Sequence, residues 1–345
     1  MGDGMRGRGI SYDTGFVRNG ATSREPFELE VVERELRIIR DDLHCNAVRI
    51  MGGDPERLEI AAACAADLGL EVWFSPYPLE LSEDEMLSLF ADCAERAERL
   101  RRRGAEVVFV TGAELSLMNH GFLPGGTLDE RLSLLLHDRQ RLPELLPGVI
   151  ARVNEFLDKA VALVRARFGG RVTYAAIPLE RPDWSRFDIV SVDLYRSSEI
   201  AGQFVQGVRS LVAQGKPVAI TEFGAATFRG AGDRGARGLE IAEYDDTGRP
   251  VGLTGDYARD EDGQATYVRE LLEVFDAEGV DSAFVFTFAL HDFPHCPEGD
   301  PSPDLDLASF GIVKVLGDGR GTTYPGMVWE PKAAFRMLAG HYGGY

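Results

Sequence analysis

The sequence has no excess of positive charge. It contains 37 lysine and arginine residues against 56 aspartate and glutamate residues, which gives a formal net charge of −19. Proteins that bind nucleic acid or anionic membranes present a basic surface. We therefore expect neither a nucleic-acid partner nor a membrane partner.

Long apolar runs and cysteine motifs are also missing. No run approaches the roughly 20 apolar residues that cross a bilayer. The start has no apolar segment of the signal-peptide kind, and we expect residues 1–5 to be disordered or left over from expression. The four cysteines (Cys45, Cys64, Cys93 and Cys296) have no CxxC spacing, and three lie in apolar elements. This pattern favours reduced thiols and a cytoplasmic location.

What the sequence does contain is a regular alternation of strand-like and helix-like segments. Short apolar runs predict eight strands, at residues 8–12, 45–50, 71–76, 106–111, 171–177, 188–195, 216–224 and 282–288. Helical spacing of apolar residues predicts helices over 26–43, 54–66, 82–103, 149–168, 199–213, 260–278 and 329–338. Such alternation is typical of a parallel α/β architecture.

Two parallel architectures compete for this pattern. A doubly wound sheet usually carries a GxGxxG turn after an early strand, and the sequence has none. Eight strands and 345 residues fit a (β/α)8 TIM barrel, which typically needs about 250 residues. We predict a single α/β barrel domain over 1–345, with long loops after strands 4, 7 and 8. The loop at 225–260 is predicted to be mostly irregular and to lie beside the cleft as a lid.

The stretch Lys216–Gly224 points to chemistry. Its apolar strand runs directly into Glu222, and a buried carboxylate is costly unless it is hydrogen-bonded or used. Taken alone, Glu222 could equally turn out to solvent. In a barrel, however, the active site lies at the carboxyl ends of the strands. The predicted strand ends carry Arg49, Ser75, Glu114, Glu180, Tyr195, Glu222, His291 and Asp292.

Several of these segments resemble the clan A glycoside hydrolases, a superfamily of retaining (β/α)8 enzymes. The segments Thr111–Glu114 and Ile220–Gly224 match the ends of its strands four and seven. The resemblance implies that Glu114 is the acid/base and Glu222 the nucleophile. Asn46–Ile50 resembles the strand whose arginine, here Arg49, supports the nucleophile. Asp193–Tyr195 resembles the strand whose tyrosine, here Tyr195, donates a hydrogen bond to it.

The sequence departs from the clan pattern at two positions. Ala113 stands where many members have an asparagine that contacts the sugar 2-hydroxyl, a contact that supplies several kcal/mol in the transition state. Phe286 and Phe288 occupy the region of the usual strand-eight tryptophan. More narrowly, RELRIIRDDLHCNAVRI and LGLEVWFSPYP resemble actinobacterial proteins labelled "abortive infection protein", a label that implies phage exclusion.

Side chains near the predicted mouth supply candidates for substrate contact. They are Trp73, Tyr77, Glu180, Phe288, His291 and Asp292. Aromatic residues at strand ends are more often rim packing than sugar platforms. For Glu180, exposure to solvent is the alternative to substrate contact. The loop at 291–296 contains metal-ligand types, but its proline and irregular spacing do not suit a preformed site. We expect no metal and no cofactor.

The sequence thus predicts a retaining β-glycosidase-like hydrolase acting on a small glycoside or oligosaccharide. In that case the Glu114 and Glu222 carboxyl groups should lie about 5–5.5 Å apart, whereas about 6.5–9.5 Å would indicate inversion. One alternative uses the same carboxylates for proton transfer on a non-sugar metabolite. Another is a non-hydrolytic binding or phage-defence protein. The oligomeric state stays open.

Overall fold

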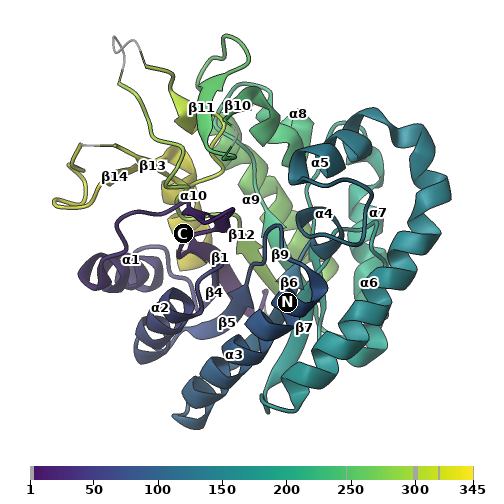
Figure 1. Ribbon diagram of the computed structural model, residues 1–345. Coiled ribbons are helices and arrows are strands. Elements are labelled where there is room, and N and C mark those ends of the chain that lie inside the picture. Colours follow the sequence, from purple (N-terminus) through teal and green to yellow (C-terminus); the bar gives the residue numbers. More distant parts are fainter. Residues whose placement is uncertain (1–3, 246, 298–301, 318, 345) are drawn as a thin grey trace.

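The chain folds around one central sheet of eight parallel strands (Figure 1). The computed structural model describes residues 4–245, 247–297, 302–317 and 319–344. The sheet consists of β1 (Gly7–Asp13), β4 (Ala47–Gly52), β5 (Glu71–Pro76), β6 (Val107–Ala113), β7 (Arg171–Ala175), β8 (Val190–Asp193), β9 (Val218–Phe223) and β12 (Ser282–Val285). These are the eight predicted strands, with ends shifted by a few residues.

The sheet closes on itself. Its strand order is β7-β6-β5-β4-β1-β12-β9-β8, and a parallel bridge between Ala176 and Val192 joins the two outer strands. The Asp188 N–H also donates to the Val172 carbonyl oxygen at 3.0 Å. The predicted (β/α)8 barrel is confirmed.

Long helices surround the barrel (Figure 1), and the described residues form seven of them. They are α1 (Leu29–Asp41), α2 (Pro55–Asp67), α3 (Glu83–Arg102), α6 (Leu142–Arg165), α7 (Ala201–Val212), α9 (Glu261–Glu278) and α10 (Ala333–Gly343). The α2 helix begins where predicted, because the Asp54 side chain accepts the Glu56 and Arg57 N–H groups and Pro55 follows it. The α6 helix begins at Leu142 rather than Val149, with Pro147 inside it.

Apolar side chains form two layers. A small cluster fills the barrel itself and includes Trp73, whose ring centroid lies 4.7 Å from that of Phe284. A larger cluster lies between the strands and the helices. Alternate residues of a strand point to opposite faces, so each strand supplies both layers. Inner-layer residues near the carboxyl ends of the strands therefore reach the barrel mouth.

The three predicted long loops carry structure of their own. After β6 come α4 (Leu115–Met118), α5 (Leu128–His137) and η1 (Arg139–Arg141). After β9 come α8 (Ala231–Arg234), η3 (Gly235–Ile241), β10 (Ala242–Tyr244) and β11 (Pro250–Leu253). After β12 come η4 (Leu305–Leu307), β13 (Val313–Val315) and β14 (Trp329–Pro331). Two short strands, β2 (Val17–Arg18) and β3 (Ala21–Thr22), follow β1, and η2 (Trp184–Arg186) lies between β7 and β8.

The segment 225–260 lies on the carboxyl side of the strands, as predicted. The Ser198 N–H, just past β8, donates to the Asp233 carbonyl oxygen at 3.0 Å, and the Thr227 N–H donates to the Leu307 carbonyl oxygen at 3.0 Å. The prediction of a mostly irregular loop was wrong, because short helices and the β10–β11 hairpin occupy much of it. Residue 246 lies outside the described residues.

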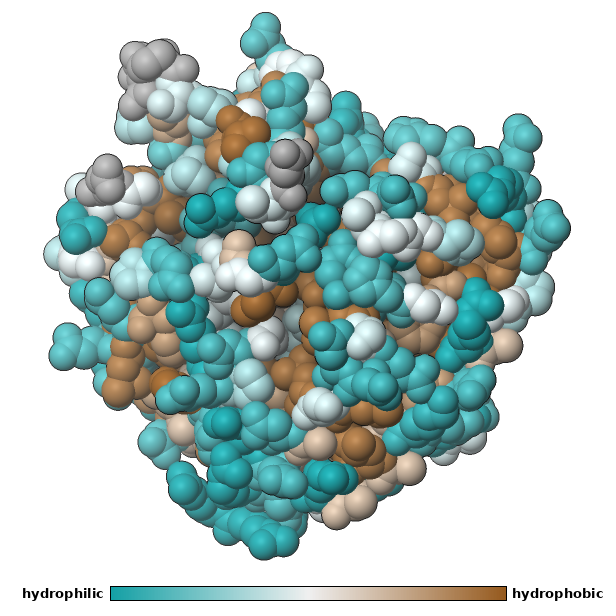
Figure 2. Space-filling view, viewed as in Figure 1, coloured by the Kyte–Doolittle hydropathy of each residue, from teal (hydrophilic) through white to brown (hydrophobic). Residues whose placement is uncertain are grey.

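The start of the described chain is packed rather than loose. The Met5 side chain is buried, and its N–H donates to Asp276 Oδ1 at 2.8 Å. The disorder expected for residues 1–5 therefore does not extend to Met5, while residues 1–3 lie outside the described residues. Within the described part of the chain, every helix is too short or too polar to be a membrane span. Hydrophilic side chains cover most of the face seen in Figure 2.

Candidate active site

The end of β6 is irregular, and this irregularity delivers Glu114 to the barrel mouth. The pairing of β6 with β7 shifts register between Val110 and Ala113, and Gly112 has a φ of 78°. A side chain at position 112 would bring its Cβ within 2.9 Å of Leu115, so glycine is required here. Glu114 follows directly, with 9% of its surface exposed.

The end of β9 delivers Glu222, and the glycine of the TEFG motif lets the chain pass close to its neighbour. A Cβ at Gly224 would lie 2.4 Å from the Phe286 carbonyl oxygen. Any larger residue would push the end of β9 away from the end of β12. Glu222 itself is 4% exposed, so it does not turn out to solvent.

Arg49 and Tyr195 both hydrogen-bond the Glu222 carboxylate. Arg49 Nη1 donates to Glu222 Oε1 at 2.9 Å, and its Nε donates to Ser75 Oγ at 3.1 Å. The Tyr195 hydroxyl donates to Glu222 Oε2 at 3.2 Å. Arg49 is completely buried, which is costly for a guanidinium unless carboxylates surround it. Each oxygen of Glu222 therefore accepts a bond that favours its ionised form.

A third carboxylate, Asp193, completes the cluster. Oxygen atoms of Glu114, Asp193 and Glu222 all lie within 4.8 Å of one another. Asp193 is the β8 partner of Glu222 in the sheet register, so the two side chains share a face. Its Oδ1 lies 3.8 Å from Arg49 Nη1, and neither of its oxygens makes a well-formed hydrogen bond to a described residue. Sequence reasoning treated Asp193 only as part of the strand motif, although its place at the end of a strand beside that of Glu222 was a usable signal.

Burial raises the pKa values of all three acids, and for Glu114 and Asp193 the charges of neighbouring acids add to the rise. Burial raises the pKa of Glu114 well above its usual range, and the charges of Glu222 and Asp193 add to that effect. Burial likewise raises the pKa of Asp193 well above its usual range, with Glu222 adding to the rise and Arg49 opposing it. Burial raises the pKa of Glu222, while the Arg49 charge and the bonds from Arg49 and Tyr195 oppose the rise. Of the three acids, Glu222 is therefore the one whose ionised form receives direct support from a cation and two hydrogen bonds, whereas for Glu114 the neighbouring charges add to the rise in pKa.

Of the predicted substrate contacts, Tyr77 lies beside this cluster. Burial raises its pKa well above the usual value, and the charges of Glu222 and Glu114 add to the rise. Its ring packs edge-on against Phe16, with centroids 5.0 Å apart. A tyrosine at this position can offer both a hydroxyl and an aromatic edge to a bound molecule.

Three other predicted contacts lie elsewhere, and those predictions were wrong. Trp73 is completely buried inside the barrel, and its Nε1 donates to Glu71 Oε1 at 2.7 Å, toward the amino end of β5. Phe288 packs in the outer layer against Trp329, with centroids 5.2 Å apart. Glu180 is completely buried, and both of its oxygens accept hydrogen bonds from protein groups. It is neither solvated nor open to a substrate.

His291 and Asp292 are half-buried in the loop after β12. Burial lowers the pKa of His291 well below its usual value, with Arg24 adding to the effect. Burial raises the pKa of Asp292 to about 7, and the charge of Asp13 contributes. Asp13 ends β1, so these two residues lie near the β1 side of the mouth. Contact between either of them and a substrate stays a prediction.

The three clustered carboxylates also supply oxygen donors of the kind that hard cations prefer. Arg49 already places a positive charge at 2.9 Å from one of these oxygens. The expectation of no metal and no cofactor stays a prediction.

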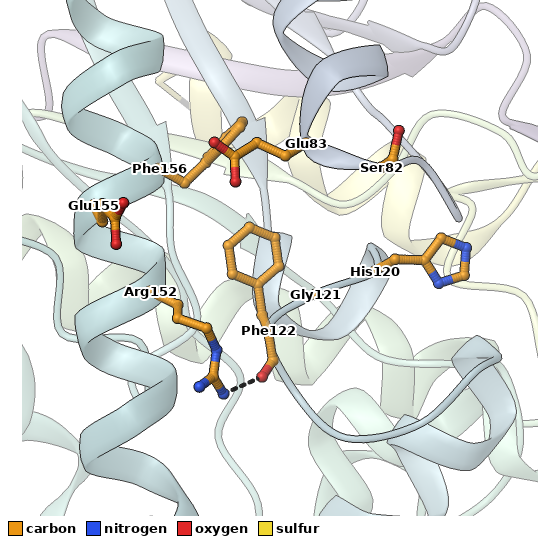
Figure 3. A pocket seen from close by; sticks show the side chains of 8 residues that line it. All are labelled: Ser82, Glu83, His120, Gly121, Phe122, Arg152, Glu155 and Phe156. Atoms are coloured by element: carbon orange, nitrogen blue, oxygen red, sulfur yellow. Dashed lines mark hydrogen bonds between the residues drawn. The ribbon is translucent and has the colours of Figure 1, made fainter.

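A separate surface pocket of about 280 Å³ lies between the start of α3, the chain after α4 and the middle of α6 (Figure 3). Phe122 and Phe156 form its apolar side, and Arg152 Nη2 donates to the Phe122 carbonyl oxygen at 2.5 Å. None of the three clustered carboxylates lines it. The pocket is therefore distinct from the barrel mouth.

The fold and the site together define a (β/α)8 barrel whose mouth holds two opposed glutamates, on its fourth and seventh strands. No protein-family model and no curated protein matches the sequence. Solved structures with a similar fold include several glycoside hydrolases.

The chain is similar to a GH113 β-1,4-mannanase, with a TM-score of 0.59 and 14% identity over 99% of this chain and 100% of the other. It is also similar to the GH113 β-mannanase AaManA of Alicyclobacillus acidocaldarius, solved in complex with ManMIm, with a TM-score of 0.57 and 15% identity over 99% and 98% of the two chains. A third similar structure is Cel5A of Thermotoga maritima in complex with cellobiose, with a TM-score of 0.52 and 14% identity over 89% and 97%. At these identities the likeness shows the fold.

Proposed function

We propose that this protein is a retaining β-glycoside hydrolase of the clan A type, acting on a small glycoside or oligosaccharide. One observation carries the proposal: carboxylate oxygens of Glu114 and Glu222 lie within 4.8 Å of each other at the ends of strands four and seven. Retaining enzymes hold their two carboxyl groups about 5–5.5 Å apart, and inverting enzymes leave about 6.5–9.5 Å for a water molecule. The closer spacing supports retention.

Each proposed role follows from the local electrostatics. In the first step the Glu222 carboxylate attacks the anomeric carbon, while Glu114 gives its proton to the glycosidic oxygen as the carbon–oxygen bond breaks. In the second step the Glu114 carboxylate takes a proton from water, whose oxygen attacks the same carbon and releases Glu222. Arg49 and Tyr195 keep Glu222 ionised before the first step. The two-glutamate mechanism requires no metal.

The solved neighbours suggest which sugars to test. They include a β-1,4-mannanase and an enzyme in complex with cellobiose, so we propose a β-linked hexoside as substrate. Ala113 cannot supply a side-chain hydrogen bond to the sugar 2-hydroxyl. We therefore expect a weaker dependence on that hydroxyl than in enzymes with an asparagine at this position.

A panel of aryl β-glycosides and β-1,4-linked disaccharides of mannose and glucose tests the proposal. The wild-type protein should hydrolyse at least one of them. Glu222→Gln, which keeps the shape but removes the nucleophile, should lose about 10⁴-fold or more in kcat, on the scale of deleting other enzyme nucleophiles. A barrel that performs proton transfer on a non-sugar metabolite would leave every glycoside intact.

The same panel also tests the alternative suggested by the narrower resemblance to proteins labelled "abortive infection protein". A non-hydrolytic binding or phage-defence protein would also leave the panel intact, and Glu222→Gln would then change binding rather than turnover. The proposal includes a cytoplasmic setting, in which Cys45 and Cys93 remain the buried free thiols that they are in the fold.

A further inference from the structure

The backbone at Glu114 needs outside support. Its φ of 46° and ψ of 38° lie in the left-handed region, which costs a non-glycine residue about 1–2 kcal/mol. Such a conformation persists where the surrounding contacts fix it. Glu114 also stands directly before α4, where a side chain usually accepts the free N–H groups of the first turn, yet it makes no such bond.

Two buried side chains take over that capping function. The Leu115 N–H donates to the Tyr174 hydroxyl oxygen at 2.9 Å, and the Ser116 N–H donates to Glu180 Oε1 at 2.8 Å. The Tyr174 hydroxyl in turn donates to Glu180 Oε2 at 2.6 Å. The chain around Glu180 is fixed as well, because the Ile177 N–H donates to the same oxygen at 3.1 Å.

The Glu114 N–H completes the arrangement by donating to the Ala175 carbonyl oxygen at 2.9 Å. Three consecutive N–H groups, at residues 114, 115 and 116, are thus held by β7 and the turn that follows it. Because the first turn of α4 is capped from outside, the Glu114 side chain is left to face Glu222. A glutamate that capped its own helix would point its carboxylate at the backbone instead.

We propose that Tyr174 and Glu180 are positioning residues for the general acid, acting on Glu114 through the backbone of Leu115 and Ser116. The inference rests on the proposed function for its activity test, and on the geometry alone for its structural test. Neither residue touches the substrate, since both are completely buried.

Tyr174→Phe is the sharpest variant, because it removes one hydroxyl and keeps the ring. Tyr12→Phe is its matched control: the buried Tyr12 hydroxyl donates to Glu35 Oε2 at the same 2.6 Å, in the outer layer away from Glu114. Both variants lose a buried tyrosine–glutamate bond, so a general loss of stability should appear in both. Glu180→Gln is the second variant, should Tyr174→Phe fail to fold.

The activity test uses aryl glycosides of the accepted sugar that differ in the acidity of the released phenol. General acid catalysis matters most for poor leaving groups and contributes about 10²–10⁴-fold. A displaced Glu114 should therefore lower kcat/KM by about 10-fold or more for the least acidic phenol and by less than about 3-fold for the most acidic one. Tyr12→Phe should change kcat/KM by a similar factor for the least acidic and the most acidic phenol. Equal losses across the phenols in Tyr174→Phe would overturn the proposal.

The structural test measures amide hydrogen exchange and does not depend on turnover. In Tyr174→Phe the Leu115 and Ser116 amides should exchange about 10-fold faster or more, relative to Tyr12→Phe, since each loses or weakens its buried acceptor. Unchanged protection at both amides would overturn the proposal. A wild-type protein that cleaves no glycoside, combined with faster exchange, would remove the proposed function while leaving the capping arrangement in place.

Discussion

Two ionic clusters in this molecule, one buried around Arg49 and one partly buried around Arg259, balance their charges differently. At the strand ends, one cation, Arg49, faces the three carboxylates of Glu114, Asp193 and Glu222. Between the loops after β9 and β12, Lys332 and Arg259 face Asp306 and Asp304, and Arg259 and Lys314 also pair with Glu261. Lys332 Nζ lies 2.7 Å from Asp306 Oδ1, Arg259 Nη1 lies 2.8 Å from Asp306 Oδ2, and Arg259 Nη2 lies 2.7 Å from Asp304 Oδ2.

This difference in charge balance indicates a structural role for the loop cluster and a chemical role for the strand-end cluster. The loop cluster is balanced in charge, and the Lys332 ammonium also donates to Thr227 Oγ1 at 2.8 Å, which ties the two loops together. The strand-end cluster sets three acidic groups against one cation, and among the described residues the cation nearest to Asp193 is Arg49, at 3.8 Å, whereas Asp306 has a cation within 2.8 Å of each oxygen. Burying such charge is costly, and strongly perturbed acids of this kind gather at functional sites. The comparison therefore predicts losses of stability at one cluster and changes in chemistry at the other.

The largest effect is expected from Lys332→Met, which leaves Asp306 with one cation fewer in a buried site. Removing one partner of a buried pair costs about 3–5 kcal/mol, and urea unfolding at pH 7 should show a loss of this size. The enzyme that remains folded should keep the wild-type pH–rate profile. A loss below about 1 kcal/mol would mean that the loop cluster does not hold the loops.

Arg49→Met should act mainly on chemistry. Without the guanidinium, Glu222 is easier to protonate, so turnover should fall by at least about 10²-fold, as on removal of other electrostatic groups. The acidic limb of the pH–rate profile should move to higher pH, since that limb reports ionisation of the nucleophile. The groups facing Glu222 are Arg49, Tyr195, Asp193, Glu114 and Tyr77.

Lys332→Met is the matched control for this experiment, because it also replaces a buried cation with methionine. A shift of the acidic limb in Arg49→Met alone supports the role assigned to Arg49. Near-normal turnover and an unshifted limb in folded Arg49→Met would reduce Arg49 to a structural residue.

Asp193→Asn should make the protein more stable than wild type, by an amount that grows as the pH rises. Burial raises the pKa of Asp193 in the folded state, so the stability linked to this group is fully present below about pH 4 and is lost as the pH rises through the folded pKa. Asparagine does not titrate. The variant should therefore gain roughly 1–3 kcal/mol over wild type at pH 8 and less at pH 4.5, by denaturant unfolding. If the variant and wild type differed in free energy of unfolding by the same amount at pH 4.5 and pH 8, burial of Asp193 would carry no electrostatic cost.

The smallest effect is expected from Lys159→Met. Lys159 Nζ lies 2.8 Å from Glu83 Oε1, but both side chains are about half exposed. Exposed pairs contribute little because water and salt screen them. Thermal unfolding of this variant should match wild type within error, and a clear loss would show that exposed charges matter here as much as those of the two clusters.

The strand ends are the part of the molecule that the sequence predicts best. Apolar runs mark the strands, and barrel geometry brings their carboxyl ends together, so Glu114, Glu222, Arg49 and Tyr195 could be grouped before any coordinates were known. Their proposed roles still await experiment. Asp193 ends the strand beside that of Glu222, so its position could mark it as a member of the site. The sequence does not show that its oxygens lack a hydrogen-bond partner among the described residues.

Side chains whose direction depends on loops or layers could not be predicted in the same way. Trp73 lies on the inner face of β5, but its indole extends toward Glu71 instead of the mouth. Phe288 follows the end of β12, where the chain turns into the outer layer. The position of Glu180 depends on a loop between β7 and η2, and a sequence does not show that its partners would be backbone N–H groups and Tyr174.

The most direct test of the two-glutamate account is the stereochemistry of the first product. Proton NMR of the anomeric signal, recorded during hydrolysis of an accepted aryl β-glycoside before mutarotation, distinguishes the two outcomes. Oxygens of Glu114 and Glu222 within 4.8 Å of each other predict that the β-anomer forms first, through a covalent intermediate on Glu222. Initial formation of the α-anomer would contradict the account.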